Sequence, residues 1–218
     1  MKLNEPFVIT ISRELGSGGR TIGRKLAEKL GVRYSDKNLI QALVDKFNLT
    51  TYEIEKIKAK KPNWFEDFLE KVAPMPRAEL MLGPRQEAGD SPIPHATTSE
   101  DLFAAESQIL RAIADEGSCV IAGRSGFFVL EDHPNKIDIF IRASRANRIA
   151  RVMRRQNLSE VEATTVIDAV DKGRETYIQR YTGTSRYDLR NYDLVINTDG
   201  LSEDDAVQII FDYIQHSA

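Results

Sequence analysis

Cysteine is nearly absent from the sequence: Cys119 is the single residue of this type among 218. One cysteine cannot form a disulfide framework or a cysteine-based metal site. The three histidines, His95, His133 and His216, lie far apart and lack metal-ligand spacing. These absences exclude the disulfide-stapled secreted domains and the zinc-binding modules.

Long apolar runs are absent as well. No stretch approaches the ~20 apolar residues that a membrane-spanning helix requires. Residues 1–6 contain no apolar run of the kind found in a signal peptide. We therefore expect a soluble, cytoplasmic protein that has no membrane partner.

Neither sign of charge dominates, since 30 Lys and Arg residues stand against 33 Asp and Glu, for a formal net charge of −3. This balance excludes a globally basic nucleic-acid-binding protein. The charge is nevertheless unevenly distributed, because residues 142–190 carry eleven basic and six acidic residues. This local excess of cations points to small polyphosphates as partners and gives no support to nucleic acid.

Short β-branched or apolar runs alternate with segments of helical periodicity. The runs at 7–12, 119–122, 137–142 and 193–197 predict buried strands. Apolar spacing and capping residues predict helices that begin near Arg20, Ser99, Arg145, Ser159 and Ser202. Strands that alternate with helices indicate an α/β fold with a parallel sheet covered on both faces.

A glycine-rich turn joins the first predicted strand to the first predicted helix. Gly16, Gly18 and Gly19 allow backbone conformations that aim several N–H groups at a phosphate, and the helix adds its positive N-terminal end. Arg20 supplies a cation, and the Thr21 hydroxyl is a candidate ligand of Mg²⁺. The turn is therefore a candidate phosphate-binding loop.

The match to the P-loop pattern G-x-x-x-x-G-K-[ST] is incomplete, because Glu14 stands at its first glycine and Arg20 at its lysine. Two other interpretations stay open from these residues alone. One is a tight glycine turn that binds no ligand. The other is a dinucleotide-binding loop, although Thr21 stands where its third small residue belongs and Asp36 is the lone candidate to bind a ribose.

Further motifs follow this turn along the chain. They are Tyr34–Lys37, Ala122–Arg124, Ala143-Ser144 with Arg148 and Arg151, Asp171 with Arg174 and Tyr177, Tyr181–Gly183, and Tyr192–Thr198. In this order, and together with residues 9–23, they resemble the cytidylate-kinase-like family of P-loop kinases, which is close to the nucleoside monophosphate kinases. The resemblance spans nearly the whole chain and is weakest over residues 50–98. An arginine at position 20 is also typical of this subfamily.

The resemblance implies a single P-loop kinase domain over residues 1–218, with a three-layer α/β sandwich around a five-stranded parallel sheet. It implies a helical acceptor-binding lobe over 36–100, which includes a proline-rich loop at 73–98, and a short lid over 148–186. It also implies that the γ-phosphoryl group of ATP is transferred to CMP or dCMP with Mg²⁺ as cofactor. Small nucleotides would then be the partners, of either a monomer or a homodimer.

Phosphoryl transfer depends mainly on positioning and charge neutralisation. The resemblance implies that the donor phosphates bind Gly16, Ser17, Gly18, Gly19 and Arg20, with Thr21 on the metal ion. Arg124 would bind the acceptor phosphate, and Asp36 would lie at the acceptor nucleoside. Arg148 and Arg151 would reach the donor from the lid, while Arg174, oriented by Asp171, would close over the transferring group. The catalytic residues implied are thus Arg20, Arg124, Arg148, Arg151, Asp171 and Arg174.

Two positions depart from the family pattern. Ser125 follows Arg124 where typical bacterial cytidylate kinases have an Asp that helps to read the acceptor, and Val170 stands at an expected lid arginine. A nucleotide-binding regulatory protein with a degraded kinase site is therefore a second hypothesis. A third is a P-loop kinase that phosphorylates a different small molecule.

Arg20→Ala is expected to lower kcat by at least ~100-fold, because a single positioned donor commonly contributes that much transition-state stabilisation. Initial rates of ADP release with ATP and CMP measure the effect. An unchanged kcat would exclude Arg20 from the chemical step.

Overall fold

The computed structural model describes residues 1–36 and 99–217. The chain divides into two compact units, one formed by residues 1–36 with 117–218 and the other by residues 37–116. The predicted acceptor-binding lobe (36–100) and its proline-rich loop (73–98) fall almost entirely outside the described residues. They therefore stay predictions, as does the lid over 148–186.

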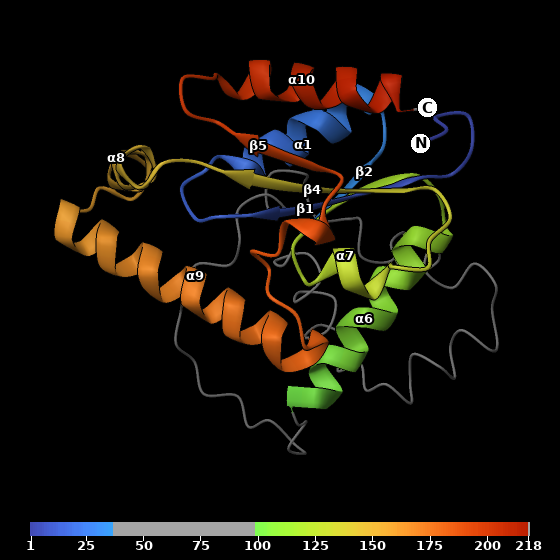
Figure 1. Ribbon diagram of the computed structural model, residues 1–218, viewed down its shortest axis with the longest axis horizontal. Helices are drawn as coiled ribbons and strands as arrows, with labels where there is room; N and C mark the ends of the chain where they lie inside the picture. The colour runs from blue at the N-terminus through green and yellow to red at the C-terminus, as the bar shows by residue number, and fades with distance from the viewer. Residues whose placement is uncertain (37–98, 218) are drawn as a thin grey trace, which may run out of the picture. The chain divides into compact units, whose positions relative to one another are not determined.

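A five-stranded sheet forms the centre of the first unit (Figure 1). Its strands are β1 (Val8–Arg13), β2 (Arg33–Asp36), β3 (Cys119–Ala122), β4 (Lys136–Arg142) and β5 (Leu194–Asn197). They lie in the order β2-β3-β1-β4-β5, which places the first strand in the middle. Every neighbouring pair is parallel, so the predicted α/β class and the five-stranded parallel sheet are confirmed.

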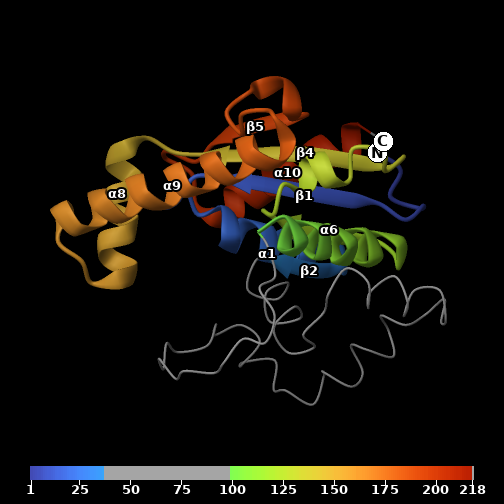
Figure 2. The same ribbon diagram turned by 90° about the horizontal axis from the view of Figure 1, so that it is seen from below.

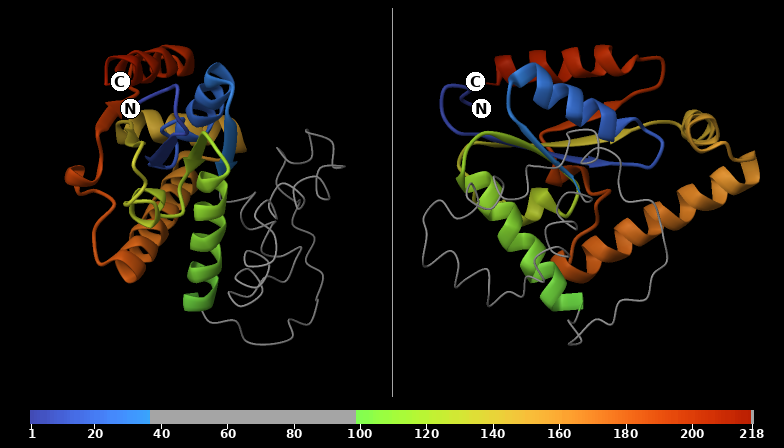
Figure 3. Two further views of the ribbon diagram at one scale, coloured as in Figure 1. Left: turned by 90° about the vertical axis from the view of Figure 1, so that its right-hand side faces the viewer. Right: turned by 180° about the vertical axis from the view of Figure 1, so that it is seen from behind.

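Alternate residues of the central strands point to opposite faces of the sheet. Ile9 and Ile11 of β1 join the hydrophobic core on the side of α1 (Gly19–Leu30) and α10 (Glu203–His216). Figure 3 shows these two helices side by side on that face. Because β1 is covered on both faces, its sequence is a nearly continuous apolar run, as in other buried parallel strands.

The opposite face carries the short helix α7 (Gly126–Val129) and a buried polar cluster. The Asp138 carboxylate accepts a hydrogen bond from Thr10 Oγ1 and lies 2.7 Å from Lys136 Nζ. Lys136 Nζ also donates to the Phe127 carbonyl at 2.7 Å. The cluster joins β1, β4 and α7, and burial raises the pKa of Asp138 above its usual value.

The helices begin close to the predicted residues. The others in the described part are α6 (Ser99–Asp115), α8 (Arg145–Gln156), α9 (Glu160–Thr182) and the 3-10 turn η1 (Leu189–Asn191). Gly31 ends α1 in the left-handed region, at φ +67°. Ser159 with Glu162 and Ser202 with Asp205 form capping boxes that open α9 and α10.

Helices α8 and α9 meet beyond the end of the sheet to which β1 and β4 point (Figures 1 and 2). Helix α6 belongs to the second unit, and its Ile109, Leu110 and Ile113 are buried. Among the helices of residues 1–36 and 99–217, none is long and apolar enough to cross a membrane.

Ile210→Ala is expected to lower the free energy of unfolding by about 2–5 kcal/mol, because Ile210 is 0% exposed in the core under α10 and its truncation leaves a cavity. Its neighbour Ile209 is 42% exposed, so Ile209→Ala should change stability by no more than about 0.5 kcal/mol. Urea unfolding of both variants measures the difference. Equal losses of unfolding free energy would contradict the orientation of α10, in which Ile210 faces the core and Ile209 the solvent.

Candidate active site

Parallel strands end at the same edge of a sheet, and ligands of open α/β sheets bind outside that edge. The residues that end or follow the strands here include Arg13, Asp36, Gly123–Ser125, Arg142 and Thr198. Most of the predicted site residues therefore come from segments that meet at one edge of the first unit. Helices α8 and α9 supply the others from beyond this edge (Figure 2).

Residues 13–19, which we call the glycine loop, connect β1 to α1. Gly16 and Gly18 have φ values of +85° and +86°, in the region that favours glycine. A Cβ atom at Gly16 would lie 2.7 Å from the Arg148 carbonyl oxygen, so the loop also needs a glycine there for space. The backbone of α8 therefore packs directly against the loop.

Several amide groups of this region are not used within the protein. The N–H groups of Gly16, Gly18, Gly19, Arg20 and Thr21 donate to no acceptor among the residues that the structure describes. The first N–H groups of a helix have no partner inside it and carry partial positive charge. A row of such donors after a central strand is a suitable cradle for phosphate oxygens.

Glu14 anchors the loop. Its Oε1 lies 3.2 Å from Arg148 Nη1, and its Oε2 accepts a hydrogen bond of 3.2 Å from the Ala143 amide. Arg148 Nε in turn donates to the Leu15 carbonyl at 2.8 Å. The residue that departs from the P-loop pattern thus ties the loop to the start of α8, a role that the sequence pattern did not indicate.

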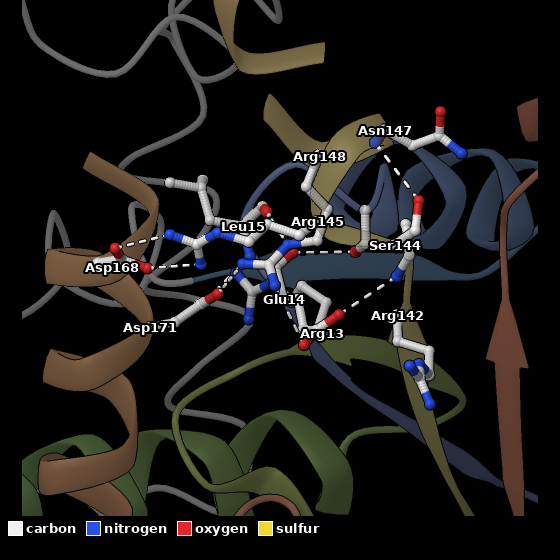
Figure 4. A network of polar contacts seen from close by, with 12 residues as sticks. Arg13, Glu14, Leu15, Arg142, Ser144, Arg145, Asn147, Arg148, Asp168 and Asp171 are labelled. Atoms are coloured by element: carbon white, nitrogen blue, oxygen red, sulfur yellow. Dashed lines mark hydrogen bonds and ion pairs between the residues drawn. The ribbon is translucent and has the colours of Figure 1, made fainter. Parts of the chain in front are cut away.

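Asp171 of α9 completes this network, which Figure 4 shows from close by. Its carboxylate accepts hydrogen bonds from Arg148 Nη2 and from the Leu15 amide, the latter at 3.0 Å. Arg174 Nη1 donates to it at 3.3 Å, and Arg186 Nη1 lies 3.5 Å away. The structure therefore brings together Arg148, Asp171 and Arg174, which were predicted, with Arg186, which was not.

The two arginines predicted to reach the donor lie in different surroundings. Arg148 is buried, and its guanidinium faces Glu14, Asp171 and the Leu15 carbonyl, so it supports the loop from behind. Arg151 lies on the loop itself, since a Cβ atom at Gly18 would be 1.9 Å from Arg151 Nη1. From the sequence, Arg148 and Arg151 were predicted to have the same role, because helical spacing does not show which of them is buried.

The Thr21 hydroxyl lies at the start of α1 and accepts a hydrogen bond of 3.1 Å from Arg155 Nη2. The same nitrogen lies 2.9 Å from Glu203 Oε1, and Arg151 Nη1 lies 3.8 Å from that oxygen. No group of three or more potential metal ligands is present in the described part of the chain. A magnesium ion at Thr21 would therefore be held mainly by phosphate oxygens and water, which is how Mg²⁺ commonly binds.

Arg20 points to the end of β2. Its Nε donates to Asp36 Oδ2 at 2.8 Å, and its carbonyl accepts a hydrogen bond of 3.3 Å from the Tyr34 hydroxyl. Burial, with Asp36 nearby, raises the pKa of Tyr34 to about 12, so this hydroxyl stays protonated at neutral pH. The structure joins the predicted donor residue Arg20 to the predicted acceptor residue Asp36.

The turn after β3 has an unusual backbone. Gly123, Arg124 and Ser125 have φ values of +90°, +55° and +54°. Two successive non-glycine residues in the left-handed region are costly, and such strain is concentrated at functional sites. The Arg124 guanidinium lies over the Tyr177 ring, 5.6 Å from its centre. The turn thus presents the predicted acceptor-phosphate residue from a strained loop beside α9.

Two arginines of the site, Arg13 and Arg186, were missed by the sequence analysis. Arg186 is 1% exposed, and its Nη2 donates to the Arg13 carbonyl, as does Arg174 Nη1 at 3.0 Å. Burial, with Arg13 and Arg186 nearby, lowers the pKa of Arg174 to about 10. Arg186 belongs to no motif, whereas Arg13 is the first residue of the glycine loop and could have been found from that position.

Cys119 lies in β3 and is 1% exposed. Burial raises the pKa of its thiol to about 12, so the thiolate is scarce at neutral pH. Cys119 is therefore an apolar core residue, as predicted.

Comparison with known proteins identifies relatives along the whole chain. A family model described as the cytidylate kinase-like family matches residues 8–200. A cytidylate kinase of Sulfurisphaera tokodaii is 26% identical over 209 residues, which cover 95% of both chains. A cytidylate kinase of Sulfolobus acidocaldarius is 27% identical over 219 residues, which cover 96% of this chain and 97% of the relative.

Solved structures share the fold. An uncharacterized protein from Eubacterium ventriosum is 25% identical, with a TM-score of 0.65 over 96% of this chain and 98% of that one. A shikimate kinase from Bacteroides thetaiotaomicron is 14% identical, with a TM-score of 0.51 and the same coverage. The predicted P-loop kinase fold is confirmed.

Asp171→Asn is expected to lower the free energy of unfolding by about 3 kcal/mol, because it leaves the buried arginines around it without their shared carboxylate. The control is Asp168→Asn on the same helix. Asp168 pairs with Arg145 at the surface, so its loss should cost no more than about 1 kcal/mol. Thermal and urea unfolding compare the two, and a smaller loss for Asp171→Asn would contradict the network.

Proposed function

The chain belongs to the cytidylate kinase-like family and is a nucleoside monophosphate kinase, and we propose that it transfers the γ-phosphoryl group of ATP to CMP or dCMP. The observation that carries this proposal is the row of amide groups at Gly16 and at residues 18–21 that no described acceptor uses, surrounded by arginines from α8, α9 and the end of β1. Phosphoryl transfer requires these two components together.

The donor phosphates lie on Gly16, Ser17, Gly18 and Gly19, with Arg151 beside Gly18. The Thr21 hydroxyl would hold Mg²⁺, which would neutralise phosphate charge. That hydroxyl accepts a hydrogen bond from Arg155, which would keep its ion pair with Glu203 if Thr21 turned to the metal ion. Arg148 holds the loop against α8 throughout.

The acceptor phosphate binds Arg124 in the strained turn after β3. Asp36, which Arg20 orients, lies at the acceptor nucleoside. Arg174, held by Asp171, neutralises charge on the group in transfer. Small nucleotides are thus the partners, and the family resemblance together with the cytidylate kinases among the relatives supports a pyrimidine acceptor.

The test is a coupled assay of ADP release with ATP, Mg²⁺ and each of CMP, dCMP, UMP, AMP and GMP. CMP or dCMP is expected to give a kcat/KM at least ~10-fold above that of the purine nucleotides, about 1.4 kcal/mol of discrimination in the transition state. ATP binding by calorimetry with no turnover of any acceptor would instead support a nucleotide-binding regulatory protein.

Two glycine variants verify that the activity belongs to this site. Gly16→Ala is expected to abolish measurable turnover, because its Cβ atom would lie 2.7 Å from the backbone carbonyl oxygen of Arg148, which cannot turn aside as a side chain can. Gly31→Ala is the matched control, since Gly31 also has a positive φ but a methyl group there would meet no described atom within 4 Å. Gly31→Ala should cost about 1 kcal/mol of stability and leave kcat unchanged.

A further inference from the structure

Arg13 differs from Arg148, Arg174 and Arg186 in its lack of a carboxylate partner among the described residues. Arg148, Arg174 and Arg186 all lie within ion-pair distance of Asp171. The Arg13 guanidinium forms no hydrogen bond and no ion pair with any residue of the described part of the chain. An arginine remains charged at neutral pH, so this is a partly buried cation without a described counter-charge in contact.

The backbone of Arg13 is held firmly while its side chain is not. Its carbonyl accepts hydrogen bonds from both Arg174 Nη1 and Arg186 Nη2. Arg186 is itself fixed, since its amide donates to Glu175 Oε2 at 3.2 Å and its carbonyl accepts from the Tyr192 hydroxyl at 2.8 Å. Two guanidinium groups thus gather behind Arg13 and add to the positive potential around it.

The Arg13 guanidinium lies between the two loops of the site. Arg13 is the first residue of the glycine loop, which is the proposed donor cradle. Its Nη1 lies against Gly123, the first residue of the strained turn that carries Arg124, since a Cβ atom there would be only 2.1 Å from it. The side chain therefore extends from the donor loop to the acceptor turn.

Burial lowers the pKa of Arg13, and Arg186 and Arg20 lower it further, while Tyr34 and Asp36 act in the opposite direction. The charged form is thus destabilised until an anion arrives. A phosphoryl group passing from donor to acceptor places its negative charge on three equatorial oxygens between the two phosphates. This is the region that the Arg13 guanidinium reaches.

We propose that Arg13 is a catalytic residue that binds the phosphoryl group during its transfer, and that Arg174 and Arg186 position it through its carbonyl. In this step an acceptor phosphate oxygen forms a bond to the γ-phosphorus as the bond to the bridging oxygen of ADP breaks. The electron pair of the broken bond leaves with ADP. Arg13 stays protonated and contributes charge and hydrogen bonds only. This role rests on the proposed function.

The test compares Arg13→Met, Arg13→Lys and the control Arg154→Met, which changes an exposed residue in the last turn of α8. Arg13→Met is expected to lower kcat at least ~100-fold with the KM values for ATP and CMP within about threefold. Arg13→Lys should recover part of kcat, because it restores the charge but not the planar fork. Arg154→Met should behave as the wild type.

Thermal unfolding separates this role from a structural one. Removing a partly buried cation that has no described carboxylate partner should leave the Tm of Arg13→Met equal to or above that of the wild type. A Tm well below that of the wild type, or a kcat within threefold of it, would overturn the proposal.

A second arm does not depend on the acceptor. Aluminium fluoride with ADP mimics a phosphoryl group in transfer, and it should raise the Tm of the wild-type protein above that with ADP alone. Arg13→Met should lose this extra stabilisation and keep that by ADP. If the wild type turns over no nucleotide, the proposed function fails, and the aluminium fluoride experiment alone tests the role of Arg13. The proposal for Arg13 would be overturned if aluminium fluoride raised the Tm of both proteins equally, or raised the Tm of neither.

Discussion

The buried ion pairs of Arg148 hold the glycine loop in its shape, and the rest of the site depends on them. Arg148 from α8 meets Glu14 of the loop and Asp171 of α9, and it also donates to the Leu15 carbonyl. A buried charge is tolerated only when its partners are in place, so loss of any member leaves the others uncompensated. The network therefore ties the loop to both helices, and the loop in turn places the amide groups at Gly16 and at residues 18–21.

The arginines around this network outnumber its carboxylates, so the site has an excess of positive charge. Within the part of the chain that the structure describes, Arg148, Arg174 and Arg186 share two carboxylates, those of Glu14 and Asp171, and Arg13 lies beside them without one. Folding thus assembles more cations than these carboxylates neutralise, next to a row of backbone donors. Groups arranged in this way before the substrate binds need little reorganisation during the reaction, which makes them effective in stabilising a charged transition state.

The sequence predicted the local features well. The strands at 119–122 and 137–142 and the starts of α9 and α10 at Ser159 and Ser202 depend on neighbouring residues, so periodicity and capping rules identify them. Glu14 illustrates the limit. Against the P-loop pattern it was a mismatch, whereas in the structure it ties the loop to Arg148 and to the Ala143 amide.

The sequence by itself determined the α/β class, the position of the glycine loop between the first strand and the first helix, and the set of basic residues available to the site. Only the tertiary structure decided what each arginine does: Arg148 supports the loop, Arg151 lies on it, Arg20 meets Asp36, and Arg13 pairs with no carboxylate of the described residues. The reason is physical. Each role is set by contacts between segments that are far apart in the chain, such as Leu15 with Arg148 and Asp171, and burial of these contacts decides which charges are paired and which are left for a ligand.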